Sequence, residues 1–190
     1  MSEKGTLMVF SGPAGTGKDT VLECFAAKKM KGVWKSVSYT TRQPRENEKD
    51  GVDYHFITRE KFERLIKDGA MLEYAKYGLN YYGTPKAPVD EHLKNGDTVI
   101  LKIEVQGARQ IKALYPDAVG VFVLPPSLEV LEKRLRGRGS ETDEDVIRRL
   151  SIAKKELEYS VNYEYRIVND DLDDAVNDLY SIVRSLQLKQ

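Results

Sequence analysis

Short apolar runs alternate along this chain with stretches of helical periodicity. The clearest runs are TLMVF at 6–10, DTVILKIEV at 97–105, DAVGVFVLPP at 117–126 and EYRIVND at 164–170. Most of these runs are apolar at successive positions, which is typical of parallel strands buried on both faces. We therefore predict that they form the parallel sheet of an α/β protein.

The segments between the runs predict helices that cover this sheet. One helix is expected over 19–29, a second over 108–114 and a long one over 142–160. Ser127 and Thr142 precede helical stretches and are predicted to be N-caps, since their hydroxyls can accept a backbone hydrogen bond. The last helix has apolar residues at helical spacing, namely Leu172, Ala175, Val176, Leu179, Val183 and Leu186. Alternating strands and helices favour a sheet with helices on both sides.

Residues 35–88 have a different character. They are rich in tyrosine, glycine and charge, and they contain short strand signals and one helical stretch, REKFERLIKDG, that ends on Gly69. We interpret this segment as a lobe inserted into the sheet domain.

A glycine-rich loop follows the first apolar run. Gly12, Gly17 and Lys18 fit the pattern G-x-x-x-x-G-K between a predicted strand and a predicted helix. Glycines let backbone N–H groups turn toward phosphate oxygens, and the helix N-terminus adds partial positive charge. The segment predicts a nucleotide phosphate loop.

The inserted segment offers residues for a second anion site. Arg42 and Arg45 can hold a phosphate through their planar guanidinium groups, and Tyr54 can add a hydroxyl donor. Glu73, which only accepts hydrogen bonds when ionised, suits a base edge with adjacent N–H donors, such as guanine. Alone, these residues could form a solvated charged loop, but next to a phosphate loop they favour nucleotide binding.

Three arginines follow in the second half of the chain. Arg134 and Arg138 are four residues apart at the end of a predicted helix, and Arg149 lies in the next one. Arginines in this arrangement suit a lid over a phosphoryl group in transfer. The alternative is a solvated basic helix face.

Composition narrows the functional classes. The chain has 30 Lys and Arg and 30 Asp and Glu, so a net charge of zero argues against general affinity for nucleic acid or anionic membranes. Its one cysteine cannot form an intramolecular disulfide, and no apolar run reaches the roughly 20 residues of a membrane span. We expect a cytoplasmic protein with no membrane or nucleic-acid partner.

Together these segments resemble guanylate kinase over nearly the whole chain. The resemblance rests on SGPAGTGK, SVSYTTRQPR, GVDYHF, EYAKYGLNYYGTPK, VQGARQIK, FVLPPS, RLRGRGSET and IVNDDLDDAV, in that order. It implies transfer of the γ-phosphoryl group of ATP to GMP, and also to dGMP, with Mg²⁺ as cofactor. It also implies a phosphate-loop kinase core (1–34, 89–136 and 146–190), an inserted GMP-binding lobe (about 35–88) and a small lid (about 137–145) within one domain of 190 residues.

The resemblance also assigns roles to individual residues. For GMP it implies Ser38, Arg42, Arg45, Tyr54, Glu73, Tyr82, Thr84 and Glu104. For ATP it implies Gly12, Pro13, Ala14, Gly15, Thr16, Gly17, Lys18, Asp19, Thr20 and Asn169. For the transfer itself it implies Lys18, Arg42, Arg134, Arg138 and Arg149.

Two positions depart from the family pattern. Asp19 stands where a small residue, often serine, is usual, and Lys102 stands where an acidic residue is usual. Both positions lie near the expected magnesium ion, and their charges are opposite. We hypothesise that Asp19 and Lys102 form an ion pair; alternatively, Asp19 or Thr20 binds Mg²⁺, or position 19 simply tolerates variation while Lys102 reaches solvent.

These departures leave a second functional hypothesis open. The chain could be a nucleotide-binding relative with weak or no transfer activity, acting as a sensor or scaffold. A kinase for another monophosphate is disfavoured by Glu73 and Thr84 on the base-reading side. We expect a monomer or homodimer that acts on ATP and GMP.

Overall fold

The computed structural model describes residues 4–137 and 142–189. Its core is a parallel sheet in the order β2-β7-β1-β8-β9. The strands are β1 (Leu7–Ser11), β2 (Val33–Lys35), β7 (Thr98–Lys102), β8 (Val119–Leu124) and β9 (Tyr165–Val168). The predicted α/β class with a parallel sheet is confirmed.

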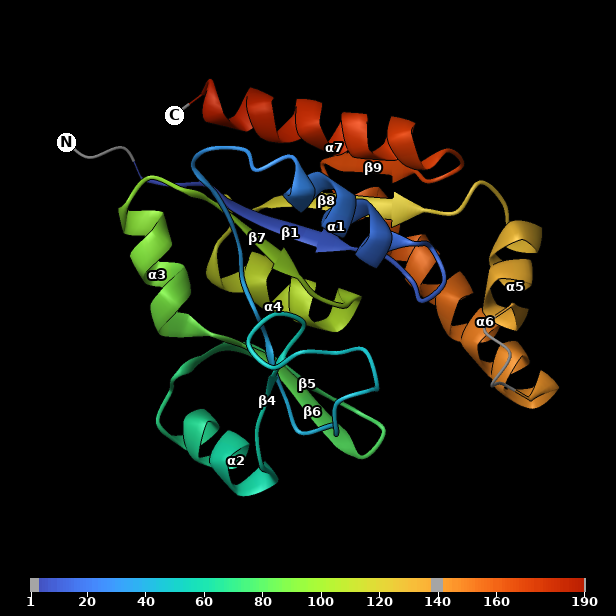
Figure 1. Cartoon of the computed structure of the whole chain (residues 1–190), viewed down its shortest axis with the longest axis horizontal. Coiled ribbons are helices and arrows are strands. Elements are labelled where there is room, and N and C mark those ends of the chain that lie inside the picture. Colours follow the sequence, from blue (N-terminus) through green and yellow to red (C-terminus); the bar gives the residue numbers. More distant parts are fainter. Residues whose placement is uncertain (1–3, 138–141, 190) are drawn as a thin grey trace.

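Helices cover both faces of this sheet (Figure 1). In β1, Met8 and Phe10 pack with α1 (Lys18–Ala27) and α7 (Leu172–Gln187) on one face. Leu7 and Val9 point to the other face, where they pack with α3 (Lys86–Lys94) and α4 (Val105–Leu114). Alternation along one strand therefore supplies two separate cores, as its apolar run predicts.

A second sheet forms the inserted lobe, below the core in Figure 1. Its strand order is β4-β3-β6-β5, with β3 parallel to β4 and antiparallel to β6, and β6 antiparallel to β5. The elements are β3 (Tyr39–Thr40), β4 (His55–Phe56), α2 (Arg59–Lys67), β5 (Met71–Tyr77) and β6 (Asn80–Pro85). The helix α2 is followed by Gly69 in a left-handed conformation, as the sequence predicts.

Beside the core, α5 (Leu128–Arg136) packs on α6 (Asp143–Glu158) through a small apolar cluster of its own. A short 3₁₀ helix, Tyr159–Asn162, follows α6. The hydroxyls of Ser127 and Thr142 accept hydrogen bonds from the backbone N–H groups of Val130 and Asp145, so both predicted N-caps are confirmed.

Element boundaries differ from expectation at several places. The strand expected over 97–105 ends at Lys102, and α4 begins at Val105 rather than at 108. The predicted helix over 19–29 is shorter, because it ends at Ala27. The helix α3 was not anticipated, and the expected lobe boundary near residue 88 falls inside it. No helix in the described part of the chain is long and apolar enough to cross a membrane.

Candidate active site

The phosphate loop (residues 12–17) connects β1 to α1. The Thr16 hydroxyl donates a hydrogen bond of 2.9 Å to the carbonyl of Pro13, which closes the loop on itself. Gly17 has a φ of 79°, a left-handed conformation that other residues adopt only with strain. Lys18 follows it, in the first turn of α1, and its ammonium lies 3.5 Å from the Pro13 carbonyl. The loop and the lysine thus share the N-terminal end of α1, where an anion is favoured.

Asn169 holds this loop in place from the end of β9. Its side-chain amide donates a hydrogen bond of 2.8 Å to the Thr16 carbonyl, and its own carbonyl accepts one of 3.0 Å from Arg134. A Cβ atom on Gly17 would lie 2.4 Å from the Asn169 amide nitrogen, so a larger residue there would displace this amide in addition to straining the left-handed backbone. One guanidinium nitrogen of Arg134, Nη1, is buried and has no hydrogen-bond partner among the described residues. Arg134 therefore retains a donor that an incoming anion could use.

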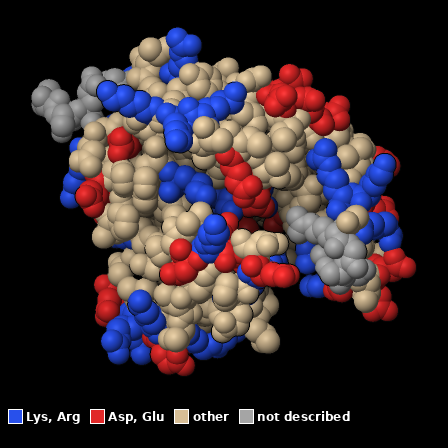
Figure 2. All heavy atoms as spheres, viewed as in Figure 1, with Lys and Arg blue, Asp and Glu red and all other residues tan. Residues whose placement is uncertain are grey.

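A cleft of about 460 Å³ separates the core from the inserted lobe. Figure 2 shows acidic and basic side chains gathered in the hollow between these two parts. Of the predicted site residues, those that line it are Ala14, Lys18, Asp19, Ser38, Arg42, Arg45, Tyr54, Glu73, Tyr82, Glu104 and Arg149. The structure therefore brings Ala14 of the phosphate loop, Lys18 and all the predicted GMP residues except Thr84 to a single cavity.

One end of the cleft has a buried carboxylate. Glu73 in β5 is 5% exposed, and its Oε1 accepts a hydrogen bond of 2.6 Å from the hydroxyl of Thr84. The two residues are direct partners on antiparallel strands. Burial raises the pKa of Glu73 to about 7, with the Thr84 hydrogen bond acting against this and the charge of Glu104 adding to it. Thr84 is buried behind Glu73 and positions it rather than lining the cleft.

Gly107 leaves the space that Glu73 occupies. It lies in α4, and a Cβ atom there would be 2.5 Å from Glu73 Oε2. Glycine to alanine in a helix usually stabilises by about 1 kcal/mol. For GMP, the acceptor that the resemblance implies, we expect Gly107→Ala to lack this gain and to displace the carboxylate, lowering kcat/KM by roughly 10²-fold. Steady-state kinetics and calorimetric titration with ATP check this; an unchanged kcat/KM for GMP, or an equal loss of ATP binding, would contradict it.

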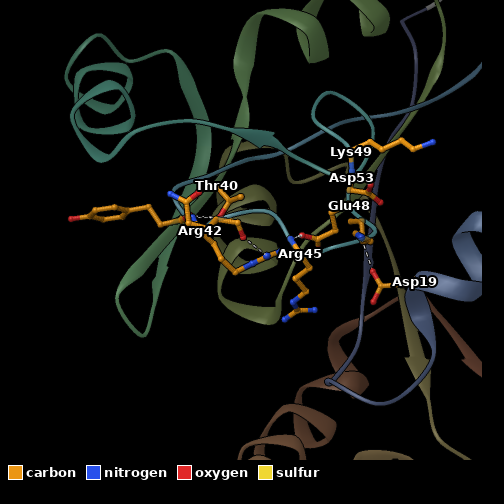
Figure 3. A network of polar contacts seen from close by, with 10 residues as sticks. Asp19, Thr40, Arg42, Arg45, Glu48, Lys49 and Asp53 are labelled. Atoms are coloured by element: carbon orange, nitrogen blue, oxygen red, sulfur yellow. Dashed lines mark hydrogen bonds and ion pairs between the residues drawn. The ribbon is translucent and has the colours of Figure 1, made fainter. Parts of the chain in front are cut away.

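Basic and aromatic side chains line another part of the cleft, also on the side of the inserted lobe. The guanidinium of Arg42 lies 5.6 Å from the centre of the Tyr54 ring, which in turn meets the Tyr82 ring edge-on. Arg42 also donates a hydrogen bond of 2.7 Å to Glu48, whose other oxygen accepts one of 2.8 Å from the backbone of Arg45. Figure 3 shows this network, with Asp19 approaching it from α1.

Glu48 was not anticipated from the sequence. The hydrogen bond from Arg42 lowers the pKa of Glu48, so this residue is a stable anion that orders the loop carrying both arginines. Its sequence signal is weak, because Arg42 and Glu48 are six residues apart in a loop with no regular spacing. Only the presence of an acidic residue close in sequence to two arginines could have indicated the contact between Arg42 and Glu48.

The hypothesised ion pair between Asp19 and Lys102 is confirmed. The Lys102 ammonium lies 2.6 Å from Asp19 Oδ1. Lys102 is the last residue of β7, and its register partner on β1 is Phe10, one residue before β1 ends. The Lys102 side chain is 21% exposed and the Asp19 side chain is 51% exposed, so the lysine is the more buried partner.

Among the described residues, the two candidate ligands Asp19 and Thr20 are poorly suited to a magnesium ion. Asp19 is already paired with an ammonium, and a dication bound to the same carboxylate would face that charge at close range. Thr20 is exposed on α1 and does not line the cleft, which disfavours it as a ligand. The described residues contain no group of three or more His, Cys, Asp or Glu that could hold a metal.

The helix α6 faces the phosphate loop across a small cavity. Arg149 and Glu156 line this cavity together with Ala14 and Glu104. Burial raises the pKa of Glu156 to about 7, and the charge of Glu104 adds to the effect. Arg149 also lines the main cleft and so connects the two spaces. Arg138, the third predicted arginine, lies with the rest of 138–141 in the part of the expected lid that is outside the described residues.

Comparison with known proteins agrees with this geometry. The family model described as guanylate kinase matches residues 4–186. The chain is 47% identical over 182 residues to a guanylate kinase of Synechocystis, covering 96% of this chain and 95% of that one. It is 48% identical over 189 residues to a guanylate kinase of Listeria monocytogenes, covering 100% of this chain and 92% of that one.

Solved structures give the same result. The crystal structure of guanylate kinase from Anaplasma phagocytophilum matches with a TM-score of 0.79 and 33% identity, covering 98% of this chain and 88% of that chain. A shikimate kinase from Bacteroides thetaiotaomicron shares only the fold, with a TM-score of 0.50 and 16% identity over 94% of this chain and 98% of that one. The chain belongs to the guanylate kinase family.

Proposed function

We propose that the protein is a guanylate kinase, which transfers the γ-phosphoryl group of ATP to GMP, and to dGMP, to give ADP and GDP or dGDP. The observation that supports this most directly is the shared cleft, which has the phosphate loop on its core side and the Glu73–Thr84 pair on its lobe side. The alternative of a nucleotide-binding protein with weak or no transfer finds no support, because the curated relatives are named guanylate kinases.

The lobe side of the cleft provides for the acceptor. Guanine presents adjacent N–H donors at N1 and N2, and an ionised Glu73 can accept both. We assign Ser38, Thr84 and Glu104 to support this contact. The GMP phosphate is assigned to the guanidinium groups of Arg42 and Arg45 and the hydroxyls of Tyr54 and Tyr82. These residues line the same part of the cleft, where Arg42 lies close to Tyr54.

The core side provides for the donor. The backbone N–H groups of residues 12–17, except Pro13, which has none, and the ammonium of Lys18 are assigned to the phosphates of ATP. Asn169 orders this loop through Thr16 and carries the carbonyl contact to Arg134. The finer placement of Asn169 near the adenine ring stays a prediction.

The transfer needs positioning and charge more than acid–base chemistry. An oxygen of the GMP phosphate attacks the γ-phosphorus, its new P–O bond forms as the bond to the β-phosphate oxygen breaks, and ADP leaves. Arg134, Arg138 and Arg149 are assigned to the negative charge of the moving group. ATP is expected to arrive with Mg²⁺, and we infer that Asp19 does not hold this ion because its carboxylate is paired with Lys102.

The activity is tested by measuring ADP formation from ATP with each of GMP, dGMP, AMP, CMP and UMP. We expect GMP and dGMP to exceed the others by at least about 10²-fold in kcat/KM, since a site built for guanine donors leaves a buried carboxylate unmatched by other bases. Binding of ATP and GMP without ADP formation would favour the nucleotide-binding alternative. A cytoplasmic location and a monomeric or homodimeric state are further predictions.

A further inference from the structure

Two positions of this site carry charges that are unusual in phosphate-loop enzymes. There, a serine or threonine after the loop lysine binds Mg²⁺, and an acidic residue on a neighbouring strand assists it. Here the residue after Lys18 is Asp19, and the strand beside β1 ends in Lys102. The Lys102 ammonium, a cation of the protein itself, therefore lies near the space that suits a metal ion in other phosphate-loop enzymes.

The Lys102 ammonium lies between the donor and acceptor sides of the cleft. On the donor side the ammonium is 2.6 Å from Oδ1 of Asp19, the residue that follows Lys18 in the chain. On the acceptor side it is 5.6 Å from the centre of the Tyr54 ring. Lys102, Lys18 and Arg42 line the same cavity. An ATP γ-phosphate and a GMP phosphate that meet in this cleft would therefore come within reach of Lys102.

Lys102 remains charged in this environment. Burial pushes its pKa down, but the negative charge of Asp19, the Tyr54 hydroxyl and the hydrogen bond to Asp19 together hold the pKa above its ordinary value. The same positive charge opposes the burial that raises the pKa of Tyr54. An ammonium has three donors, so Lys102 can keep its bond to Asp19 and still donate to a phosphate.

We propose that Lys102 binds nucleotide phosphate at the junction of the two substrates and supplies part of the charge neutralisation that Mg²⁺ supplies in other phosphate-loop kinases. This inference rests on the proposed function. Asp19 has the matching role of holding the ammonium in position. It follows that phosphate binding in this protein depends less on divalent metal than a serine and an acid at these positions would make it.

The test measures binding of an adenosine–guanosine pentaphosphate bisubstrate analogue by calorimetry, in EDTA and then in Mg²⁺. The Asp19→Asn/Lys102→Met variant removes both charges and keeps the net charge of the chain. If Lys102 contacts phosphate, this variant binds the analogue in EDTA about 10-fold or more weakly than the natural chain. The matched Asp19→Asn/Lys102→Arg variant restores a cation and is expected to recover most of the affinity.

The opposite results would overturn the inference. If Lys102 only neutralises Asp19, the Asp19→Asn/Lys102→Met variant binds the analogue in EDTA as tightly as the natural chain. Thermal unfolding confirms that each variant folds, and the Asp19→Asn/Lys102→Gln variant provides the same comparison if methionine is not tolerated. The titrations in EDTA and in Mg²⁺ both measure binding and do not depend on turnover.

A metal arm completes the experiment. The Asp19→Ser/Lys102→Asp variant carries the more usual residues, so Mg²⁺ is expected to strengthen its analogue binding by a larger factor than in the natural chain. Equal factors would overturn the inference while leaving the proposed function intact. A natural chain that binds neither ATP, GMP nor the analogue under any condition would overturn both.

Discussion

Replacing Arg149 with methionine is expected to lower kcat for ADP formation from ATP and GMP by about 10³-fold or more, the range known for arginines that stabilise a phosphoryl group in transfer. Arg149 lines both the main cleft and the small cavity beside the phosphate loop, and for this reason we assign it to the phosphoryl group in transfer. Methionine retains an unbranched apolar chain and removes the charge. Steady-state kinetics with both substrates varied measure the effect.

The division between kcat and KM tests the role more sharply than the rate alone. An interaction made mainly in the transition state lowers kcat and kcat/KM by similar factors and leaves KM nearly unchanged. A variant with normal kcat and a raised KM would contradict a catalytic role for Arg149 and assign it to substrate binding.

The neighbouring residue provides a matched control. Arg148 lies on the same helix, but its guanidinium forms an ion pair with Asp145 at 2.8 Å and its side chain is 62% exposed. Arg148→Met changes the net charge by the same amount as Arg149→Met. Exposed ion pairs contribute only about 0–1 kcal/mol to folding stability, so Arg148→Met should fold normally. We expect its kcat to stay within about 3-fold of that of the natural chain. Equal losses in the two variants would indicate a general effect of charge or folding on α6.

The core of the fold was predictable because its signals are local and strong. Met8 and Phe10 pack on one face of β1 while Leu7 and Val9 pack on the other, which is the arrangement that an uninterrupted apolar run indicates. The caps at Ser127 and Thr142 were predictable for the same reason, since a hydroxyl before a helical stretch has a specific backbone partner.

The helix α3 shows where local signals mislead. It contains Pro88, a residue that usually argues against a helix. Pro88 lies in the first turn, however, where its missing N–H group has no helical partner to lose. Because the lobe was delimited by composition as 35–88, its expected end falls inside this helix, three residues after the β6 strand ends at Pro85.

The loop after β3 could not be predicted in detail. Three of its carboxylates accept backbone N–H groups, Glu48 from Arg45, Asp50 from Phe56 and Asp53 from Lys49. These contacts follow no helical or strand period, so they could not be predicted from the sequence pattern. The arginines of the loop indicated an anion site, but the acid that orders them was visible only in the structure.

The pair Asp19–Lys102 was predictable for another reason. Each residue alone would be costly in its place, since an unpaired charge in a partly buried site loses hydration. Opposite departures at two positions that the fold brings together imply a contact across 83 residues of sequence. The sequence could not show that the ammonium also lines the cleft beside Tyr54, which required the side-chain geometry.

The second large effect concerns pH. GMP affinity is expected to weaken about 10-fold between about pH 8 and about pH 6, because Glu73 must be ionised to accept the guanine N–H donors and its pKa in the free protein is about 7. Calorimetric titration with GMP across this range measures the change. The same titrations in buffers of different ionisation enthalpy should show proton release near pH 7, since binding favours the ionised carboxylate.

Stability of the free protein should change in the opposite sense. The folded pKa of Glu73 lies above the ordinary value of 4.5, so its contribution to stability is present at acid pH and is lost as the pH rises through about 7. Bound GMP removes this loss by pairing the ionised carboxylate. The difference in thermal midpoint with and without GMP should therefore grow from about pH 6 to about pH 8.

Two variants separate Glu73 from the other groups that titrate nearby, including the phosphate of GMP itself. Glu73→Gln is expected to weaken GMP binding by about 10²-fold, because an amide has one acceptor oxygen in place of two and its NH₂ group would face a guanine N–H. It should also flatten the pH dependence to that of the phosphate. Thr84→Val removes the hydrogen bond that lowers the pKa of Glu73, so the midpoint should move to higher pH. A pH profile that survives unchanged in Glu73→Gln would assign the titration to another group, such as Glu104 or Glu156, and would remove the central support for Glu73 as the residue that reads guanine.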